Sequence, residues 1–393
     1  MANNTSTATV ATPSMAQTTV EPTGGPFVRH SEPGKGRIYD LTTQSFGGLI
    51  NQPLTALPGY AARFRLRFVA SGGVNATSIT VQGQPDAPES VVQLITLWDA
   101  LGTPIVSGPG YEVLRLIPMF SGGFGLDREA DTHNLPSFSA LATSTTQATG
   151  TGAFTFNTCI PLEFAKAYGV LGMADGDVLP KLQIQLAGSA SVYVTAPPTL
   201  PTLEVRLNAD YYWLPQGQGI APPGLGTTRQ WFLQQGNPQP AANSTATVTI
   251  PRQGGWLDTI IFICRDANNV RQDAWPSIVR FALDGIGEIS TNLDEIYDDM
   301  AISMGVGSLN SATGTAAVPR PTGVIAISRK TSLGQKIFGL LDTYETALST
   351  SPGTSMTLEG APWGSGGTGP YTINALLGQV IPSGTLIQGL EEV

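Results

Sequence analysis

Apolar and polar residues alternate along most of this chain with a period of two. Residues 62–70, ARFRLRFVA, give the clearest example, because apolar Phe or Leu occupies every even position from 64 to 68 while Arg63, Arg65 and Arg67 occupy the odd ones. Successive side chains of a β-strand point to opposite faces, so the pattern predicts strands with one buried side. Similar segments follow as far as residue 213: VVQLITLWD, EVLRLIPMF, AFTFNTCI, KLQIQLAG, SVYVTA and LEVRLNADYYWL.

A second series of strands follows residues 214–227, LPQGQGIAPPGLGT, a stretch typical of a linker or a long inter-strand loop. Its segments are RQWFLQQ, ATVTIPR, WLDTIIFICRD, SIVRFALDG, GVIAISR, KIFGLLDTY, SMTLEG, YTINALL and TLIQGLE. Each series therefore holds roughly seven to nine strands. We predict an all-β protein with an N-terminal arm (1–37), a first domain (38–213) and a second domain (214–393).

Two antiparallel eight-stranded sandwiches in tandem fit this count, and a jelly roll is a sandwich with that number of strands. Periodicity alone does not separate a jelly roll from an immunoglobulin-like or another sandwich. The length of 393 residues supports two domains, because it exceeds the usual size of one hydrophobic core. The 46 glycines and 30 prolines favour many turns and short strands over long helices.

Two short helices are predicted to interrupt the strands. The first is PLEFAKAYGVLG (161–172), which starts with proline at a favourable first position. The second covers 291–300, where Leu293, Ile296 and Met300 form one apolar stripe. The opposite side carries four carboxylates: Asp294, Glu295, Asp298 and Asp299. We expect this helix to pack its stripe on the second sandwich and to turn its acids to solvent or to an adjacent subunit.

Charge and chemistry-bearing residues point away from catalysis. The net charge of −9 suits nucleic-acid binding poorly, because that needs Lys and Arg. The two histidines, His30 and His133, have no Ser or Cys partner in a recognisable motif. The acidic loop 127–133 and the segment 265–273 are interpreted as a solvated loop and a turn, with a divalent-cation site as the alternative. The sequence predicts no enzyme and no catalytic, cofactor-binding or metal-binding residue.

Two further groups of residues receive structural interpretations. Cys159 and Cys264, the only cysteines, are predicted to be free buried thiols. The arginines of 62–70 are expected to pair with acids on a neighbouring strand or subunit. Nucleic acid is the less favoured partner, because the aromatic residues that stack bases face the other side of the strand.

The arm contains no charge in its first 20 residues and ends in the basic piece RHSEPGKGR (29–37). Such a polar, uncharged segment is expected to be disordered in isolation. The basic piece, with Arg29, Lys35 and Arg37, is interpreted as a solvated hinge. The alternative is a contact with an acidic neighbour or with lipid headgroups.

Three segments carry a resemblance to a known family: LEVRLNADYYWLPQ (203–216), WPSIVRFALDGIGEISTNLDEIYDDM (275–300) and, as the first-domain counterpart of the latter, PLEFAKAYGVLG. With the doubled strand plan and the arm, they make the chain resemble the double jelly-roll major capsid proteins of tailless icosahedral viruses. The likeness is to the tectivirus-like phages with an internal membrane.

This resemblance implies two upright jelly rolls per chain and homotrimers of pseudo-hexagonal outline that tile a virion shell. It implies a place in the virion, reached after assembly in the host cytoplasm. The implied partners are neighbouring capsid trimers, penton and minor capsid proteins, and the internal membrane through Arg29, Lys35 and Arg37 of the arm. Direct contact with nucleic acid is not implied.

Two other functions remain open from the sequence. One is a trimeric phage spike or receptor-binding protein, present in few copies per particle. The other is a two-domain β-sandwich enzyme or binding protein for carbohydrates, which requires acids or exposed aromatics gathered in one cleft.

Overall fold

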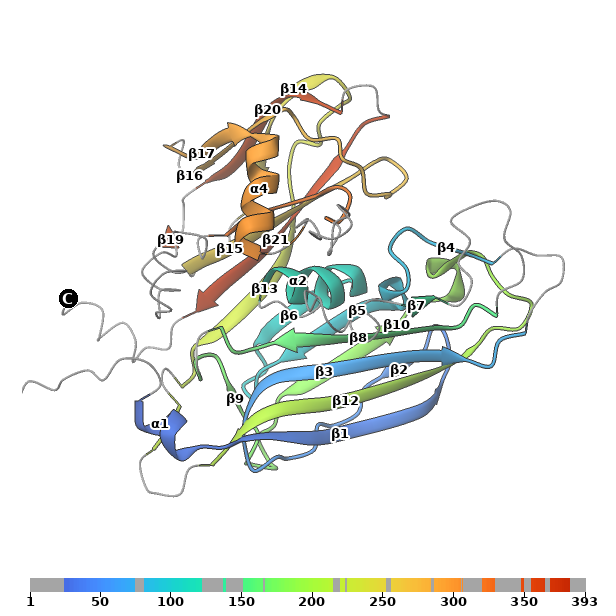
Figure 1. The fold of residues 1–393 in the computed structure, drawn as a ribbon, viewed down its shortest axis with the longest axis vertical. Helices are drawn as coiled ribbons and strands as arrows, with labels where there is room; N and C mark the ends of the chain where they lie inside the picture. Colours follow the sequence, from blue (N-terminus) through green and yellow to red (C-terminus); the bar gives the residue numbers. More distant parts are fainter. Residues whose placement is uncertain are drawn as a thin grey trace, which may run out of the picture.

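The computed structural model describes most of the chain between residues 25 and 381. Figure 1 shows two bodies of β-strands, with the first half of the chain below and the second half above. The described residues are 25–74, 81–121, 137–138, 151–164, 167–214, 220–222, 225–251, 256–283, 286–304, 306, 320–328, 348–349, 355–364 and 368–381.

Eight principal strands of the described first half form two sheets, in the orders β1-β12-β3-β8 and β2-β10-β5-β6. Numbered one to eight along the chain, these strands run 1-8-3-6 and 2-7-4-5, which is the order of a jelly roll. Their bounds are β1 Pro33–Gln44, β2 Leu49–Ile50, β3 Gly59–Ser71, β5 Val92–Trp98, β6 Pro104–Gly108, β8 Phe154–Pro161, β10 Lys181–Leu186 and β12 Thr202–Trp213.

The described second half repeats the same order, with sheets β13-β21-β15-β18 and β14-β20-β16-β17. Each half is therefore an eight-stranded jelly roll, as the strand count and the resemblance predict. The bounds are β13 Thr228–Gln235, β14 Ser244–Ile250, β15 Trp256–Arg265, β16 Ile278–Leu283, β17 Ile286–Asn292, β18 Val324–Ser328, β20 Met356–Trp363 and β21 Thr372–Ile381. Short additional strands are β4 Gln82–Gly83, β7 Ser137–Phe138, β9 Leu171–Gly172, β11 Tyr193–Thr195 and β19 Leu348–Ser349.

One sheet runs through both rolls. Strand β6 of the first roll pairs in parallel with β13 of the second, with Val106 opposite Trp231 and Ser107 opposite Phe232. The sheets on either side of this pair join into one nine-stranded sheet. Strand pairs inside each roll are antiparallel as predicted, and the parallel pair at the junction is a feature that alternation along the sequence does not reveal.

The alternating pattern of 62–70 predicts the first core correctly. Phe64, Leu66 and Phe68 of β3 are fully buried, whereas Arg63 and Arg67 on the opposite face are exposed. Phe68 stacks on Phe156 of β8 with ring centroids 4.8 Å apart. Each such buried side chain contributes about 1.5–3 kcal/mol.

The second predicted helix is confirmed as α4, Leu293–Met304. It starts directly after β17 and packs Ile296 and Met300 into the core. Leu293 and Tyr297 are partly buried beside them, and the four acids of the opposite face are exposed. The sequence predicts a strand, a turn and this helix in succession. The structure adds a further strand, β17, directly before the helix.

The first predicted helix, 161–172, is wrong. Pro161 ends β8 in register with Arg63 of β3, and Leu171–Gly172 form β9. Between them Ala167 and Gly169 have φ of 62° and 85°, a left-handed backbone that interrupts an α-helix. Strand pairing with β3 thus overrides the local helical pattern.

A helical segment instead occupies EVLRLIPMF, which the sequence suggests is a strand. It consists of the π-helical turn η2, Glu112–Leu116, followed by α2, Ile117–Ser121. Its apolar residues are buried on every side, so no periodicity distinguishes helix from strand. Like α4, the segment lies between the fifth and sixth strands of its roll.

The described end of the arm is held by its own roll. Helix α1, Gly25–His30, places Phe27 edge-on against Tyr60 and Tyr212 at centroid distances of 5.6 and 5.8 Å. Strand β1 already begins at Pro33, so the last residues of the predicted arm belong to the first jelly roll.

Short 3₁₀ turns are η1, Glu89–Val91, and η3, Ser189–Ser191. No helix among the described residues is long and apolar enough to span a membrane.

Candidate functional site

The junction between the two rolls holds a group of buried charges. Arg265, the last residue of β15 in the second roll, is almost fully buried. Its guanidinium donates to Asp86 Oδ2 at 2.6 Å and to Glu112 Oε1 at 2.7 Å, and both acceptors belong to the first roll. A buried charge is tolerated only when partners satisfy it. These ion pairs therefore hold the end of β15 against the first roll.

Arg271 adds a second connection from the same turn. Its Nε donates to Asp86 Oδ1 at 2.6 Å, and its guanidinium lies 4.1 Å from the ring centroid of Tyr111. The turn is closed by Asp266, whose Oδ1 accepts the N–H groups of Asn268 and Val270. The segment 265–273 is thus the predicted turn.

A further ionisable group, Glu89 of η1, is also buried beside the junction. Burial raises the pKa of its carboxyl, and the Arg115 guanidinium 4.0 Å away acts in the opposite direction. A cavity of about 610 Å³ opens next to these groups, with Asp86, Glu112 and Arg265 in its wall. These charged groups pair with one another. We therefore interpret the junction as a structural contact that holds the two rolls together.

The second roll contributes strands β13, β21, β15 and β18 to the nine-stranded sheet, and the outer face of β15 in this sheet is buried. In β15, Phe262 points into the second roll toward Phe281, with ring centroids 6.1 Å apart. Ile261 and Ile263, on the other side of the strand, are nevertheless fully buried. Figure 1 draws α2 of the first roll beside β13 of the second, and Glu112 at the start of the preceding helical turn reaches Arg265 at the end of β15. The start of the helical segment of the first roll thus contacts the end of β15 and the turn that follows it.

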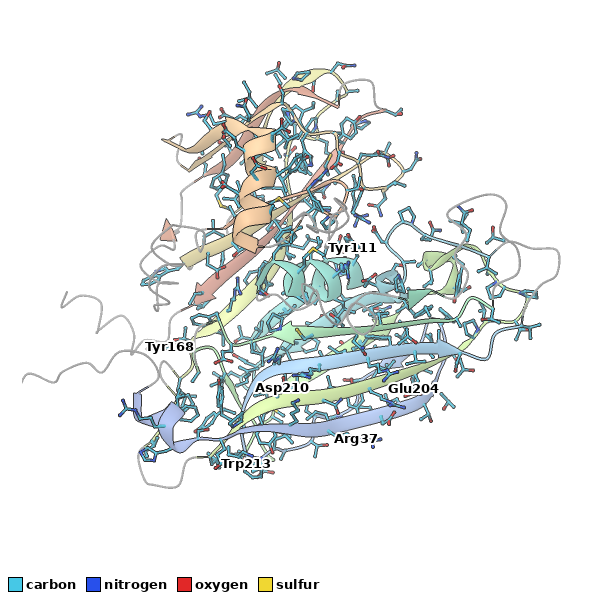
Figure 2. The ribbon with its side chains drawn as sticks, viewed as in Figure 1. Arg37, Tyr111, Tyr168, Glu204, Asp210 and Trp213 are labelled. Carbon is cyan, nitrogen blue, oxygen red and sulfur yellow. The ribbon has the colours of Figure 1, made fainter. Side chains whose placement is uncertain are left out.

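The corresponding face of the first roll is open and basic. Among the described strands β1, β3 and β12, register places six basic and three acidic side chains on it: Lys35, Arg37, Arg63, Arg65, Arg67 and Arg206 with Asp40, Glu204 and Asp210. Figure 2 labels Arg37, Glu204 and Asp210 along this sheet. We call it the basic face.

Most charges of the basic face are paired, as predicted for the arginines of β3. Arg63 and Arg65 each lie 2.7 Å from Asp210 Oδ2, on the neighbouring strand β12. Arg206 pairs with Asp40 and Glu204. Arg67 stands directly opposite Arg206 and has no carboxylate partner among the described residues. The face therefore keeps an unbalanced positive charge in a chain whose net charge is −9.

The remaining residues considered from the sequence lie apart from one another. Arg29 and His30 are exposed on α1, Lys35 is exposed on β1, and Arg37 pairs with Asp40 at 2.6 Å. Cys159 and Cys264 are buried free thiols, as predicted. The loop 127–133 with His133 lies outside the described residues. In the described part of the chain, no group of three or more His, Cys, Asp or Glu side chains is placed to hold a metal ion.

Sequence reasoning missed the residues of the junction. Asp86 lies in a loop between Pro85 and Ala87, and nothing local marks it as a partner for two arginines. Glu112 and Arg115 do carry a signal, because they are charged residues inside the apolar run YEVLRLIPMF. A charge in such a run predicts a buried ion pair, whereas its partner depends on long-range topology.

Comparison with known proteins gives matches at the level of structure. No protein-family model matches the chain, and no curated protein sequence matches it. A crystal structure of the STIV MCP superposes with a TM-score of 0.56 at 12% identity, covering 89% of this chain and 97% of that one. The atomic structure of Sulfolobus turreted icosahedral virus gives 0.59 at 11%, over 89% and 91% of the two chains. The PBCV-1 virus capsid gives 0.55 at 11%, over 89% and 93%.

The chain has the double jelly-roll fold. The matches extend through both rolls, because they cover 89% of the sequence. At an identity of 11–12% the likeness is one of fold.

Proposed function

We propose that this chain is a major capsid protein, a shell-forming component of an icosahedral virion. The observation that carries the proposal is the side-by-side joining of two jelly rolls of identical strand order through the β6–β13 pair. The structures that share this plan over 89% of the chain include a virus capsid and the particle of a turreted icosahedral virus. A building block of this kind needs large rigid faces and no active site.

In this proposal three chains form a trimer of six rolls with a pseudo-hexagonal outline, and trimers tile the shell. The fixed geometry of the internal junction supports it, because buried ion pairs and a continuous sheet hold the two rolls of one chain in one orientation. Closed rings of identical chains with head-to-tail contacts are a common form of symmetric assembly.

The arm is proposed to lie at the base of the trimer, where it reaches a neighbouring chain, a minor or penton protein, or an internal membrane. Arg29 and Lys35 support this role because both are exposed near the start of the described chain. The proposal divides the chain into the arm (1–37), the first roll (38–213) and the second roll (214–393). Strand β1 begins at Pro33, so the last residues of the arm also belong to the first roll.

The role is proposed to be structural and not catalytic. The charged groups in the wall of the 610 Å³ junction cavity, Asp86, Glu112 and Arg265, pair with one another, and no His, Cys or Lys is among the described residues of that wall. A carbohydrate-active site of paired carboxylates would need two acids free to face a sugar. Asp86 and Glu112 are both engaged by Arg265.

Copy number in purified particles tests the proposal. Quantitative mass spectrometry of virions purified from a culture that produces this chain should find it among the most abundant proteins, at hundreds of copies. A few copies at particle vertices would assign it to a spike. Absence from the particles would refute a virion role.

A further inference from the structure

The cavity at the junction has a wall built from both rolls. The first roll supplies residues of β5, of η1, η2 and η3, and of the loop that follows β4. The second roll supplies the turn after β15 and residues of β13 and β21. The volume of about 610 Å³ lies within the range of roughly 300–1,000 Å³ that is usual for small-molecule sites.

The charged side chains of the wall are already paired. Arg265 binds Asp86 and Glu112, and its Nη1 also donates to the carbonyl oxygen of Asn269 at 3.0 Å. Asp86 accepts a further hydrogen bond from Arg271. A cation would have to displace an arginine from these carboxylates, and an anion would meet a guanidinium whose donors are engaged. The pairs therefore favour a neutral ligand.

Amide and hydroxyl side chains supply the hydrogen-bonding groups that are still available. Five of them make no hydrogen bond within the part of the chain that the structure describes: Gln93, Ser191, Asn268, Asn269 and Asn374. An amide offers a donor and an acceptor side by side. Each hydroxyl of a sugar is likewise both donor and acceptor, so this wall matches a saccharide.

The same wall contains apolar surface. Leu233 of β13 and Val270 of the turn belong to it, and both are partly buried. Small-molecule sites combine apolar contact with a few polar groups that fix the orientation of the ligand. A sugar ring needs both, because its C–H groups are apolar and its hydroxyls are polar.

The turn that carries two of the amides is held in one conformation. Asp266 Oδ1 accepts the N–H groups of Asn268 and Val270 at 2.8 and 2.9 Å. Asn269 between them has a left-handed backbone with φ of 62°, and Arg265 binds its carbonyl oxygen. Groups that are fixed before binding lose little freedom when the ligand arrives.

We propose that the junction cavity binds a small neutral saccharide. Asn268 and Asn269 of the turn, Gln93 of β5 and Asn374 of β21 donate to and accept from its hydroxyls. Binding involves no bond cleavage, because the acids of the wall are engaged by Arg265.

The cavity lies at the end of the first roll that is remote from the arm. Figure 1 draws α1 and β4 at opposite ends of this roll, and Gln84, directly after β4, belongs to the wall. In a capsid with the arm at its base, the site faces outward. This placement rests on the proposed function, whereas the binding of a saccharide does not.

Saturation-transfer NMR of the purified full chain tests the binding. The neutral probes are the methyl glycosides of glucose, galactose, mannose and N-acetylglucosamine, and the anionic probes are N-acetylneuraminic acid and glucose 6-phosphate. At least one neutral glycoside should bind with a dissociation constant of about 1 mM or below. The anionic probes should bind more weakly, because the wall offers no free cation.

Removal of two amides locates the binding in the cavity. Asn268→Ala/Asn374→Ala should raise the dissociation constant at least about tenfold, because hydrogen bonds to the sugar are lost. The matched control is Asn208→Ala, at an exposed asparagine of β12 outside the wall, and it should leave the constant unchanged.

A blocking variant keeps every amide and removes the space. Gly188 belongs to the wall, and a Cβ added there meets no atom within 4 Å, so Gly188→Phe fits without strain. It should also raise the dissociation constant at least about tenfold. Gly172→Phe, at an equally open position on β9 outside the wall, should have no effect. The thermal unfolding midpoint checks that each variant is folded.

A free sugar and a glycan displayed on a surface share this chemistry. Surface plasmon resonance separates them when the bound glycoside is immobilised through its reducing end. Capture of the chain by that surface would assign the site to displayed glycans. Binding of the free glycoside alone would assign it to a small solute.

Three results would overturn the saccharide site. They are no binding of any neutral glycoside at about 10 mM, a preference for the anionic probes, and binding that both cavity variants leave unchanged. None of them bears on the number of copies in a particle, so the capsid proposal is tested separately.

Discussion

Arg265 and Glu112 are 153 positions apart in the chain, and their side chains lie 2.7 Å apart across the junction of the two rolls. One is the last residue of a strand in the second roll, and the other opens a helical segment of the first. Both are almost fully buried, so the pair fixes the orientation of the rolls as well as their proximity.

Breaking this pair from one side should destabilise the protein strongly. In Glu112→Gln, Arg265 keeps Asp86 but loses a carboxylate in a buried site, and we expect a loss of about 3–5 kcal/mol in the free energy of unfolding. Guanidinium denaturation followed by tryptophan fluorescence measures it. The control Arg37→Ala removes an exposed ion pair and should cost at most about 1 kcal/mol. Equal losses for the two variants would contradict a stabilising junction.

Glu89 should make stability depend on pH. Burial raises the pKa of its carboxyl in the folded state. A group with a raised folded pKa favours folding in its protonated form, so its contribution is present at acidic pH and is lost as pH rises through the folded pKa. Glu89→Gln removes this term, so the variant should gain stability relative to wild type as pH rises above the ordinary glutamate pKa of about 4. A difference between the two proteins that stays constant with pH would show that Glu89 does not titrate there.

The two thiols should be unreactive in the native protein. Burial raises the pKa of both Cys159 and Cys264 to about 12, and only the thiolate attacks disulfide reagents. A colour assay with an aromatic disulfide at pH 8 should detect almost no thiol before denaturant is added and two per chain afterwards. Rapid labelling of native protein would contradict their burial.

The stacked pair Phe68–Phe156 should be central to the first roll. Phe68→Ala opens a cavity in a fully buried site and should cost about 3–5 kcal/mol. The adjacent control Arg67→Ala, on the exposed face of the same strand, should change the free energy of unfolding by less than about 0.5 kcal/mol. Thermal unfolding by circular dichroism compares the two variants.

The parts of the fold that depend on local pattern could be predicted from the sequence. Alternation in 62–70 identifies the buried and exposed sides of β3, and helical periodicity identifies the buried stripe of α4. Segments without a usable period were misassigned. In the run Tyr111–Phe120 every apolar side chain is buried, so no exposed face sets a period. The segment 161–172 has helical spacing, but its first and last residues pair with β3 as strands.

The junction could not be predicted because its members are brought together by topology. Asp86 comes from a loop, Glu112 from a helical turn and Arg265 from a strand end of the other roll. Only the charges inside an apolar run hinted that buried ion pairs exist. The basic face was visible as an arginine stripe, but its positive excess requires the register of β1 and β12 with β3.

Electron microscopy of the purified protein tests the central claim most directly. A shell-forming double jelly roll predicts class averages with three-fold symmetry and six lobes in a ring, one lobe for each roll. Isolated two-lobed particles, with no rings at any protein concentration, would contradict a capsid protein.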